Sequence, residues 1–392
     1  MTEHRLEVAD VVREHQEEFL AQWGHTVSPQ QHKALRDIGA CRTPALGGHL
    51  EQCDRCGHSV IAYDSCRNRH CPKCQFSARE KWLNERAKEL LPAPYFHLVF
   101  TLPQELAPLA LQNQKVIYNL LFRAASETLL EIAADRKHLG ARIGFLAVLH
   151  TWGQNLHHHP HLHCVAPGGG ISLDGSRWIC CRNNFFLPVR VLSRLFRGKF
   201  LAFLREADQQ GQLSFFGTCA HLREPSAFQR FAKRLKKSEW VVYSKPPFGG
   251  PEQVLKYLSR YTHRVAISNS RLISLDNGQV SFRWRNYRND QIGVMTIGAV
   301  EFLRRFLQHV LPPGFVKIRH FGWLANRCRK DKLAHCRRLL SVAAIPTSSV
   351  DEPTPQHACP VCHIGFLRII GCLAAVSLSQ ATTSQPIPLD SS

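Results

Sequence analysis

Two closely spaced cysteine pairs near the N-terminus constrain the fold of this chain more than any other feature. Cys53 and Cys56 form one Cys-x2-Cys pair, Cys71 and Cys74 form a second, and fourteen residues separate the two pairs. Four thiolates at such spacings can surround one tetrahedral Zn²⁺. Because four thiolates leave no open coordination position, we expect a structural zinc ion whose binding supplies folding free energy.

Five further potential zinc ligands lie in the same part of the sequence. They are Cys41, His49, His58, Cys66 and His70. One of them could replace a cysteine of the two pairs, or several could form a second site. The sequence therefore predicts zinc in this region and leaves the full ligand set open.

The net charge of the chain indicates a polyanionic partner. Among 392 residues, 50 are Lys or Arg and 30 are Asp or Glu, which gives a formal charge of +20. A field of this sign attracts nucleic acid, since neutralised phosphates release counterions. A basic protein without such a partner is the alternative. We expect DNA as the partner and no small-molecule substrate.

Hydropathy indicates neither a membrane partner nor export. The longest apolar stretch, residues 369–378, is about half of the roughly 20 residues that a spanning helix needs, and the N-terminus is charged throughout. Without an export signal, the 15 cysteines are expected to be reduced, as in the cytoplasm.

Composition and motifs divide the chain into three parts. Residues 1–91 hold two expected helices and the zinc-binding, DNA-binding region, and residues 92–325 mix expected strands and helices. Residues 326–392 begin with a basic segment and continue into a Ser/Thr/Pro-rich stretch that reads as a disordered or truncated tail. A half-knuckle, Cys359 and Cys362, lies in this tail, but its second pair is missing, so no zinc is assigned there.

The densest group of potential metal ligands is a histidine run at residues 157–163. In an expected strand over residues 161–170, His161 and His163 point to the same face. The preceding strand, residues 141–154, offers a third ligand: Gln154 is favoured and His150 is the alternative. Two imidazoles and an amide leave positions open, which suits a catalytic ion that polarises a phosphate oxygen. The alternative is a His-rich surface loop.

Two tyrosines lie four residues apart in an expected helix over about residues 251–264. Tyr257 and Tyr261 then share a helix face. A tyrosine can attack a phosphodiester and form a phosphotyrosine, while Lys256, Arg260 and Arg264 could hold phosphates. The alternative is that both aromatic rings belong to the core.

These motifs, in this order, resemble the rolling-circle transposases of bacterial insertion sequences of the IS-ninety-one type. The resemblance spans about residues 35–340. It rests on CRTPALGGHLEQCDRCG, SCRNRHCPKCQ, FHLVFTLP, HTWGQNLHHHPHLHCVAPGGG and KYLSRYTHRVAISNSRL.

The resemblance implies a single-strand endonuclease of the HUH type, two-tyrosine subgroup. The implied fold is α+β, a ferredoxin-like sheet with helices behind it in residues 92–325, preceded by a small helical zinc-binding domain. His161 and His163 would hold Mg²⁺ or Mn²⁺, and Tyr257 and Tyr261 would be the nucleophiles. Each would cut one strand at an element end, hold the 5′ end and leave a 3′-OH.

The sequence is also compatible with two other functions. One is a zinc-dependent DNA-binding regulator without catalysis, in which the tyrosines are core residues and the histidines are incidental. The other is a replication initiator or relaxase that shares the same chemistry.

Overall fold

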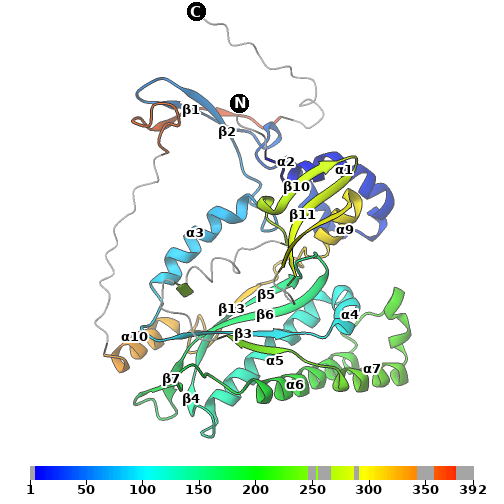
Figure 1. Ribbon diagram of the computed structural model, residues 1–392, viewed down its shortest axis with the longest axis vertical. Coiled ribbons are helices and arrows are strands. Elements are labelled where there is room, and N and C mark those ends of the chain that lie inside the picture. The colour runs from blue at the N-terminus through cyan, green and yellow to red at the C-terminus, as the bar shows by residue number, and fades with distance from the viewer. Residues whose placement is uncertain (1–4, 246–252, 255–265, 287–290, 342–356, 377–392) are drawn as a thin grey trace, which may run out of the picture.

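A computed structural model describes residues 5–245, 253–254, 266–286, 291–341 and 357–376 of the chain. Within these residues, antiparallel sheets and α-helices form a mixed α/β structure with a cysteine-rich module at its N-terminal side (Figure 1). The mixture of helices and antiparallel sheets agrees with the expected α+β class, whereas the N-terminal region, expected to be a small helical domain, also contains β-strands.

A five-stranded antiparallel sheet carries the histidine motif. Its order is β13-β5-β6-β3-β9. Aromatic and β-branched residues are frequent in β3 and β5, as expected for a pleated, buried surface, whereas β6 is rich in histidine. Their bounds are Tyr95–Thr101 for β3, Gly144–Trp152 for β5, His158–Pro167 for β6, Val242–Lys245 for β9 and Ile318–Gly322 for β13.

The two faces of this sheet have different roles. Leu162 and Cys164 of β6 belong to the main core, which they share with helices α5 (Gln114–Ala134) and α6 (Val189–Gln209). Side chains alternate along a strand, so His161 and His163 lie on the opposite face. The helices behind the sheet therefore leave the histidine face to other partners.

The N-terminal helices pack against a segment that lies far away in the sequence. Helix α1 (Val8–Trp23) and helix α2 (Pro29–Ala40) share one core with a three-stranded sheet and helix α9, which lie beside them in Figure 1. Ser28 begins α2 because its hydroxyl accepts a hydrogen bond from the Gln31 N–H, at 3.3 Å. The distant elements are β10 (Leu272–Asp276), β11 (Gln279–Asn286), β12 (Gln291–Gly298) and α9 (Ala299–Leu307).

A second three-stranded sheet combines two strands from the N-terminal region with one strand from the C-terminal region. Its order is β14-β1-β2, with β1 at Gly48–Cys53, β2 at Ser59–Tyr63 and β14 at Leu367–Leu373. Helix α3 (Cys74–Ala87) leads from this module to the five-stranded sheet (Figure 1). Part of the expected C-terminal tail is thus an ordered strand, because β1 offers its edge to β14 through backbone hydrogen bonds that composition does not reveal.

None of the helices in the described ranges combines the length and apolar character needed to cross a bilayer. The described residues also form further helices, strands and turns. These elements are α4 (Ala107–Gln112), β4 (Ala141–Arg142), β7 (Gly169–Ser172), β8 (Trp178–Cys180), α7 (Pro225–Lys237) and α10 (Arg329–Leu339), with 3-10 turns η1 (Gly24–Thr26), η2 (Pro44–Leu46), η3 (Gln104–Leu106), η4 (Gly217–Arg223) and η5 (Asn269–Arg271).

Candidate metal centres

Three histidines converge on one face of the five-stranded sheet. Strands β5 and β6 pair so that His150 lies directly opposite His161, and His163 follows two residues later on the same face. The Nε2 atoms of His161 and His163 are 3.1 Å apart. One ring nitrogen from each of the three histidines lies within 4.8 Å of the others. Such a group can hold a single cation.

Hydrogen bonds to the far side of two of these rings set their orientation. The Nδ1 of His161 lies 2.7 Å from the carbonyl oxygen of His159, to which it donates. The Nδ1 of His163 lies 2.8 Å from the Nε2 of His97, a buried residue of β3. With Nδ1 protonated on both rings, both Nε2 lone pairs face the point between them. This is how outer partners usually fix the tautomer of a metal-binding histidine.

Burial keeps the imidazole of His161 in the neutral form that binds metals. Burial lowers the pKa of His161 to about 4 and that of His97 to about 3. A desolvated imidazolium is disfavoured relative to the neutral ring. The His161 ring is therefore available as a ligand near neutral pH without first losing a proton.

The structure brings His150, the alternative third ligand, to the His161 and His163 pair. The favoured residue, Gln154, lies in the turn after β5, which ends at Trp152, and its carbonyl accepts a hydrogen bond from Arg271 at 2.6 Å. The sequence-based strand extended through residue 154, whereas strand β5 ends at Trp152.

The other histidines of the run have different surroundings. His158 is buried, and its Nε2 lies 2.8 Å from the hydroxyl of Tyr118 on α5. It therefore faces the helical core and not the histidine group. His157 is exposed in the turn before β6.

The expected nucleophiles and their neighbouring cations lie outside the described residues. These are Tyr257, Tyr261, Lys256, Arg260 and Arg264.

The inner cysteine cluster consists of Cys41, Cys66, Cys71 and Cys74, whose sulfurs lie within 4.8 Å of one another. The Cys41 to Cys74 and Cys66 to Cys74 sulfur distances are both 3.6 Å, and the Cys41 to Cys71 distance is 3.7 Å. Four sulfurs at 2.3 Å from a tetrahedral Zn²⁺ would be about 3.8 Å apart. The geometry therefore suits structural zinc.

The loop of the inner cluster also contacts the segment after α9. The guanidinium of Arg69 donates to the carbonyl oxygens of Phe315 and Pro312, at 2.6 and 2.7 Å. The Nε2 of His70 accepts from the N–H of Leu311, at 3.1 Å. His70, one of the additional ligand candidates, therefore connects the zinc-binding region to the rest of the chain.

The outer cysteine cluster consists of Cys53, Cys56, Cys359 and Cys362. The single site predicted from Cys53, Cys56, Cys71 and Cys74 is thus corrected: the structure places each pair in a different cluster. The C-terminal pair, to which no zinc was assigned, supplies half of the outer cluster. The Cys-x2-Cys spacing of Cys359 and Cys362 was the signal in the sequence that could have indicated this site. The partner pair that the C-terminal segment lacks is Cys53 and Cys56.

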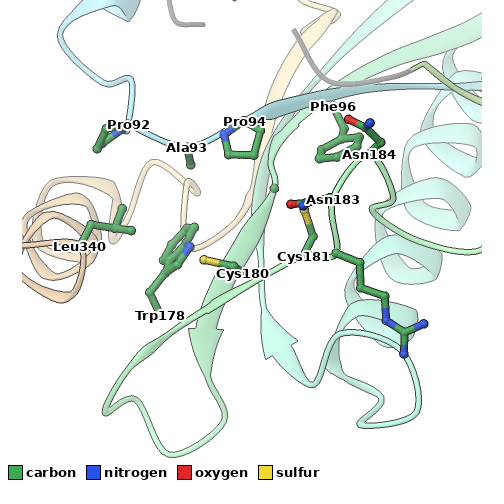
Figure 2. A pocket seen from close by; sticks show the side chains of 12 residues that line it. Pro92, Ala93, Pro94, Phe96, Trp178, Cys180, Cys181, Asn183, Asn184 and Leu340 are labelled. Atoms are coloured by element: carbon green, nitrogen blue, oxygen red, sulfur yellow. The ribbon is translucent and has the colours of Figure 1, made fainter. Parts of the chain in front are cut away.

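A cavity of about 500 Å³ lies at the other end of the five-stranded sheet (Figure 2). Phe96 of β3, Trp178 and Cys180 of β8 and the loop around Arg182 line it. None of its lining residues belongs to the histidine group or to either cysteine cluster. The cavity is therefore separate from the candidate metal centres.

Comparisons with known proteins place this arrangement among transposases. The family described as "Putative transposase" matches residues 144–332, which include the histidine group, and the family "Transposase zinc-binding domain" matches residues 11–102. The class of protein is thus a transposase with an N-terminal zinc-binding domain.

Two curated relatives extend these matches over most of the chain. The "Putative transposase y4qJ" of Sinorhizobium fredii is 55% identical over 378 residues, which cover 93% of this chain and 94% of the relative. The transposase for insertion sequence element IS801 of Pseudomonas savastanoi pv. phaseolicola is 30% identical over 345 residues, covering 85% and 80%. No solved structure matches. The chain belongs to the IS-ninety-one-type transposases of bacterial insertion sequences.

Proposed function

We propose that this transposase nicks single-stranded DNA at the ends of its element and rejoins strands in rolling-circle-type transposition. The observation that most strongly supports this proposal is the convergence of His150, His161 and His163 on one face of an antiparallel sheet. Such a group, with open coordination positions, together with the Tyr257 and Tyr261 motif of the sequence, suits HUH-type cleavage through 5′-phosphotyrosine intermediates.

The strand order supports a ferredoxin-like arrangement of the HUH type. Along the chain the elements follow as β3, α5, β5, β6, α6 and β9, and in space the strands lie in the order β9-β3-β6-β5. This is the β-α-β-β-α-β pattern of ferredoxin-like folds, with β13 added beside β5. The two helices cover the face that the histidines do not use.

The donor set fits a divalent cation that retains open positions. Imidazole nitrogens suit Mn²⁺ better than Mg²⁺, which prefers oxygen ligands. Bound there, the cation would polarise a phosphate oxygen of the DNA. The residues of the chain then have separate tasks: His150, His161 and His163 hold the ion, while His97 and the His159 carbonyl keep two of the rings oriented.

The proposed cleavage is a transesterification that conserves the phosphodiester bond energy. The phenolic oxygen of Tyr257 or Tyr261 forms a bond to phosphorus, the bond from phosphorus to the 3′-oxygen breaks, and the phenolic proton ends on that oxygen. The released 3′-OH can attack the other phosphotyrosine, which restores a phosphodiester and the free phenol. Lys256, Arg260 and Arg264, which lie beside these tyrosines in the sequence, would hold the phosphate.

The edge of the sheet offers further contacts for DNA on the histidine face. In β9, Tyr243 pairs with Val99, which pairs with His163 on its other side. Residues that face one another across a sheet share a face, so the exposed ring of Tyr243 lies on the histidine side of the sheet. Exposed aromatic rings can stack unpaired bases. Lys245, also exposed, pairs with His97 and adds a cation there.

We expect Mn²⁺ to support nicking at a concentration on the order of tenfold lower than Mg²⁺, because all three ligands are nitrogens. Titration of each ion into metal-free protein with a labelled single-stranded oligonucleotide measures the difference. If metal-free protein nicked the oligonucleotide as fast as protein supplied with Mn²⁺ or Mg²⁺, a role of the histidine group in cleavage would be contradicted.

The function is tested by detection of a covalent protein–DNA adduct. Wild-type protein and a labelled oligonucleotide carrying an element end are incubated with Mn²⁺, denatured and digested, and mass spectrometry locates the DNA-linked peptide. We expect the link on Tyr257 or Tyr261, and no adduct from the Tyr257→Phe/Tyr261→Phe double variant. Tyr243→Phe is the matched control because it removes an exposed phenolic hydroxyl on the histidine face and keeps the ring that could stack bases. It should keep the adduct.

The outcomes distinguish the competing functions. Binding without cleavage or adduct would indicate the zinc-dependent regulator, and an adduct on Tyr243 would overturn the nucleophile assignment. An initiator or relaxase would form the same adduct as a transposase. Excision of a marked donor element in cells therefore separates these last two.

A further inference from the structure

We propose that this chain binds two zinc ions, and that the second, at the outer cysteine cluster, fastens the C-terminal segment to the N-terminal zinc module. The matched zinc-binding region, residues 11–102, includes Cys53 and Cys56 and excludes Cys359 and Cys362. The site therefore combines two parts of the chain that are 303 positions apart.

The sulfur positions fit one tetrahedral ion. The sulfurs of Cys53 and Cys362 are 3.7 Å apart, as are those of Cys56 and Cys359, and all four lie within 4.8 Å of one another. A tetrahedral Zn²⁺ with bonds of 2.3 Å requires about 3.8 Å. Disulfides need sulfurs about 2.05 Å apart, so the arrangement matches thiolate ligands of a metal.

The two cysteine pairs form matching knuckles. Gly57 after the first pair has φ 72°, His363 after the second has φ 57°, and each donates its N–H to the carbonyl of the first cysteine of its pair, at 3.2 and 3.0 Å. The N–H groups of Cys56 and Gly365 lie 3.5 and 3.3 Å from the sulfurs of Cys53 and Cys362. These N–H groups stabilise negative charge on the thiolates.

The residues around the outer cluster form close contacts between the N-terminal segment and the C-terminal segment. A Cβ at Gly365 would lie 2.5 Å from the Cys53 sulfur, so this position needs a residue without a side chain. Asp54 accepts from the N–H of Phe366 at 2.8 Å and forms an ion pair with Arg368 at 3.4 Å. Strand β14 then pairs with β1 in antiparallel register.

This small sheet lacks an apolar core that could hold it without metal. Within the described part of the chain, none of the buried hydrophobic clusters contains a residue of β2 or β14. Ile369 and Ile370 of β14 are 63% and 54% exposed. Small modules without a core usually take their folding free energy from a metal or disulfides. The outer zinc ion therefore supplies the stability of the β14-β1-β2 sheet.

The test is zinc content of the purified full chain, measured by mass spectrometry of the metal and by chelator release. We expect two zinc ions per chain in wild type and one in the Cys359→Ser/Cys362→Ser variant. Cys372→Ser is the matched control: Cys372 lies on β14, is exposed and belongs to neither cluster. It should retain two ions.

Amide hydrogen exchange gives the structural readout. In the double variant, exchange should accelerate in β14 and β1 while β5 and β6 keep their protection, which shows that the rest of the chain remains folded. Two zinc ions in the double variant, or only one in wild type, would overturn the proposal. Neither readout depends on DNA cleavage, so the result stands apart from the proposed function.

Discussion

Replacing His161 by alanine is expected to lower metal-dependent nicking by at least about 100-fold, since loss of even an outer partner of a metal ligand typically costs 10- to 100-fold. The Nε2 of His161 lies 3.1 Å from that of His163, so both rings would contact the same ion. The variant should stay folded, because His161 is only partly buried and lies outside the hydrophobic core clusters.

The measurement is the single-turnover rate of oligonucleotide cleavage across a Mn²⁺ titration, with oligonucleotide affinity determined separately. His157→Ala is the matched control, because His157 belongs to the same histidine run but is exposed and outside the group. It should cleave like wild type. Unchanged cleavage by the His161→Ala variant would remove the histidine group from the mechanism, whereas loss of DNA affinity alone would indicate a binding role.

The histidine face shows what local sequence pattern can predict. Alternation along a strand predicted that His161 and His163 share a face, and strand β6 brings both into the group. The third member depends on the register between β5 and β6, which shifts between His150 and Trp152. Register is set by pairing with the neighbouring strand and by the turn, so the spacing within one strand could not choose between Gln154 and His150.

The cysteines show where local pattern is insufficient. Two Cys-x2-Cys knuckles can share one metal ion with each other, or each can share an ion with a knuckle elsewhere in the chain. The spacing within a knuckle determines its own turn but not which second knuckle completes the site. The partners of Cys53 and Cys56 lie in a segment whose composition resembles a linker. Backbone pairing of β14 with β1, together with Gly365, brings that segment into place. Likewise, α1 is one of the two helices expected in residues 1–91, while its packing against α9 depends on long-range contacts.

Replacing Cys71 by serine is expected to destabilise the chain by roughly 4 kcal/mol or more and to lower the apparent Tm by about 10 °C or more. The inner cluster lies inside a core: Cys41 and Cys71 are buried with residues of α1, α2 and α9. Losing this zinc ion therefore weakens both the N-terminal module and the contacts that Arg69 makes with Phe315 and Pro312.

Thermal denaturation with parallel zinc analysis measures the effect. Cys180→Ser is the control, because Cys180 is exposed and outside both clusters; its Tm should match wild type. The Cys359→Ser/Cys362→Ser variant should unfold at a temperature between these two, because its cluster stabilises a peripheral sheet and no shared core. If the Cys71→Ser variant kept the wild-type Tm while binding one zinc ion fewer, the inner ion would not stabilise the fold. A Tm equal to that of the outer-cluster variant would contradict the different structural roles of the two sites.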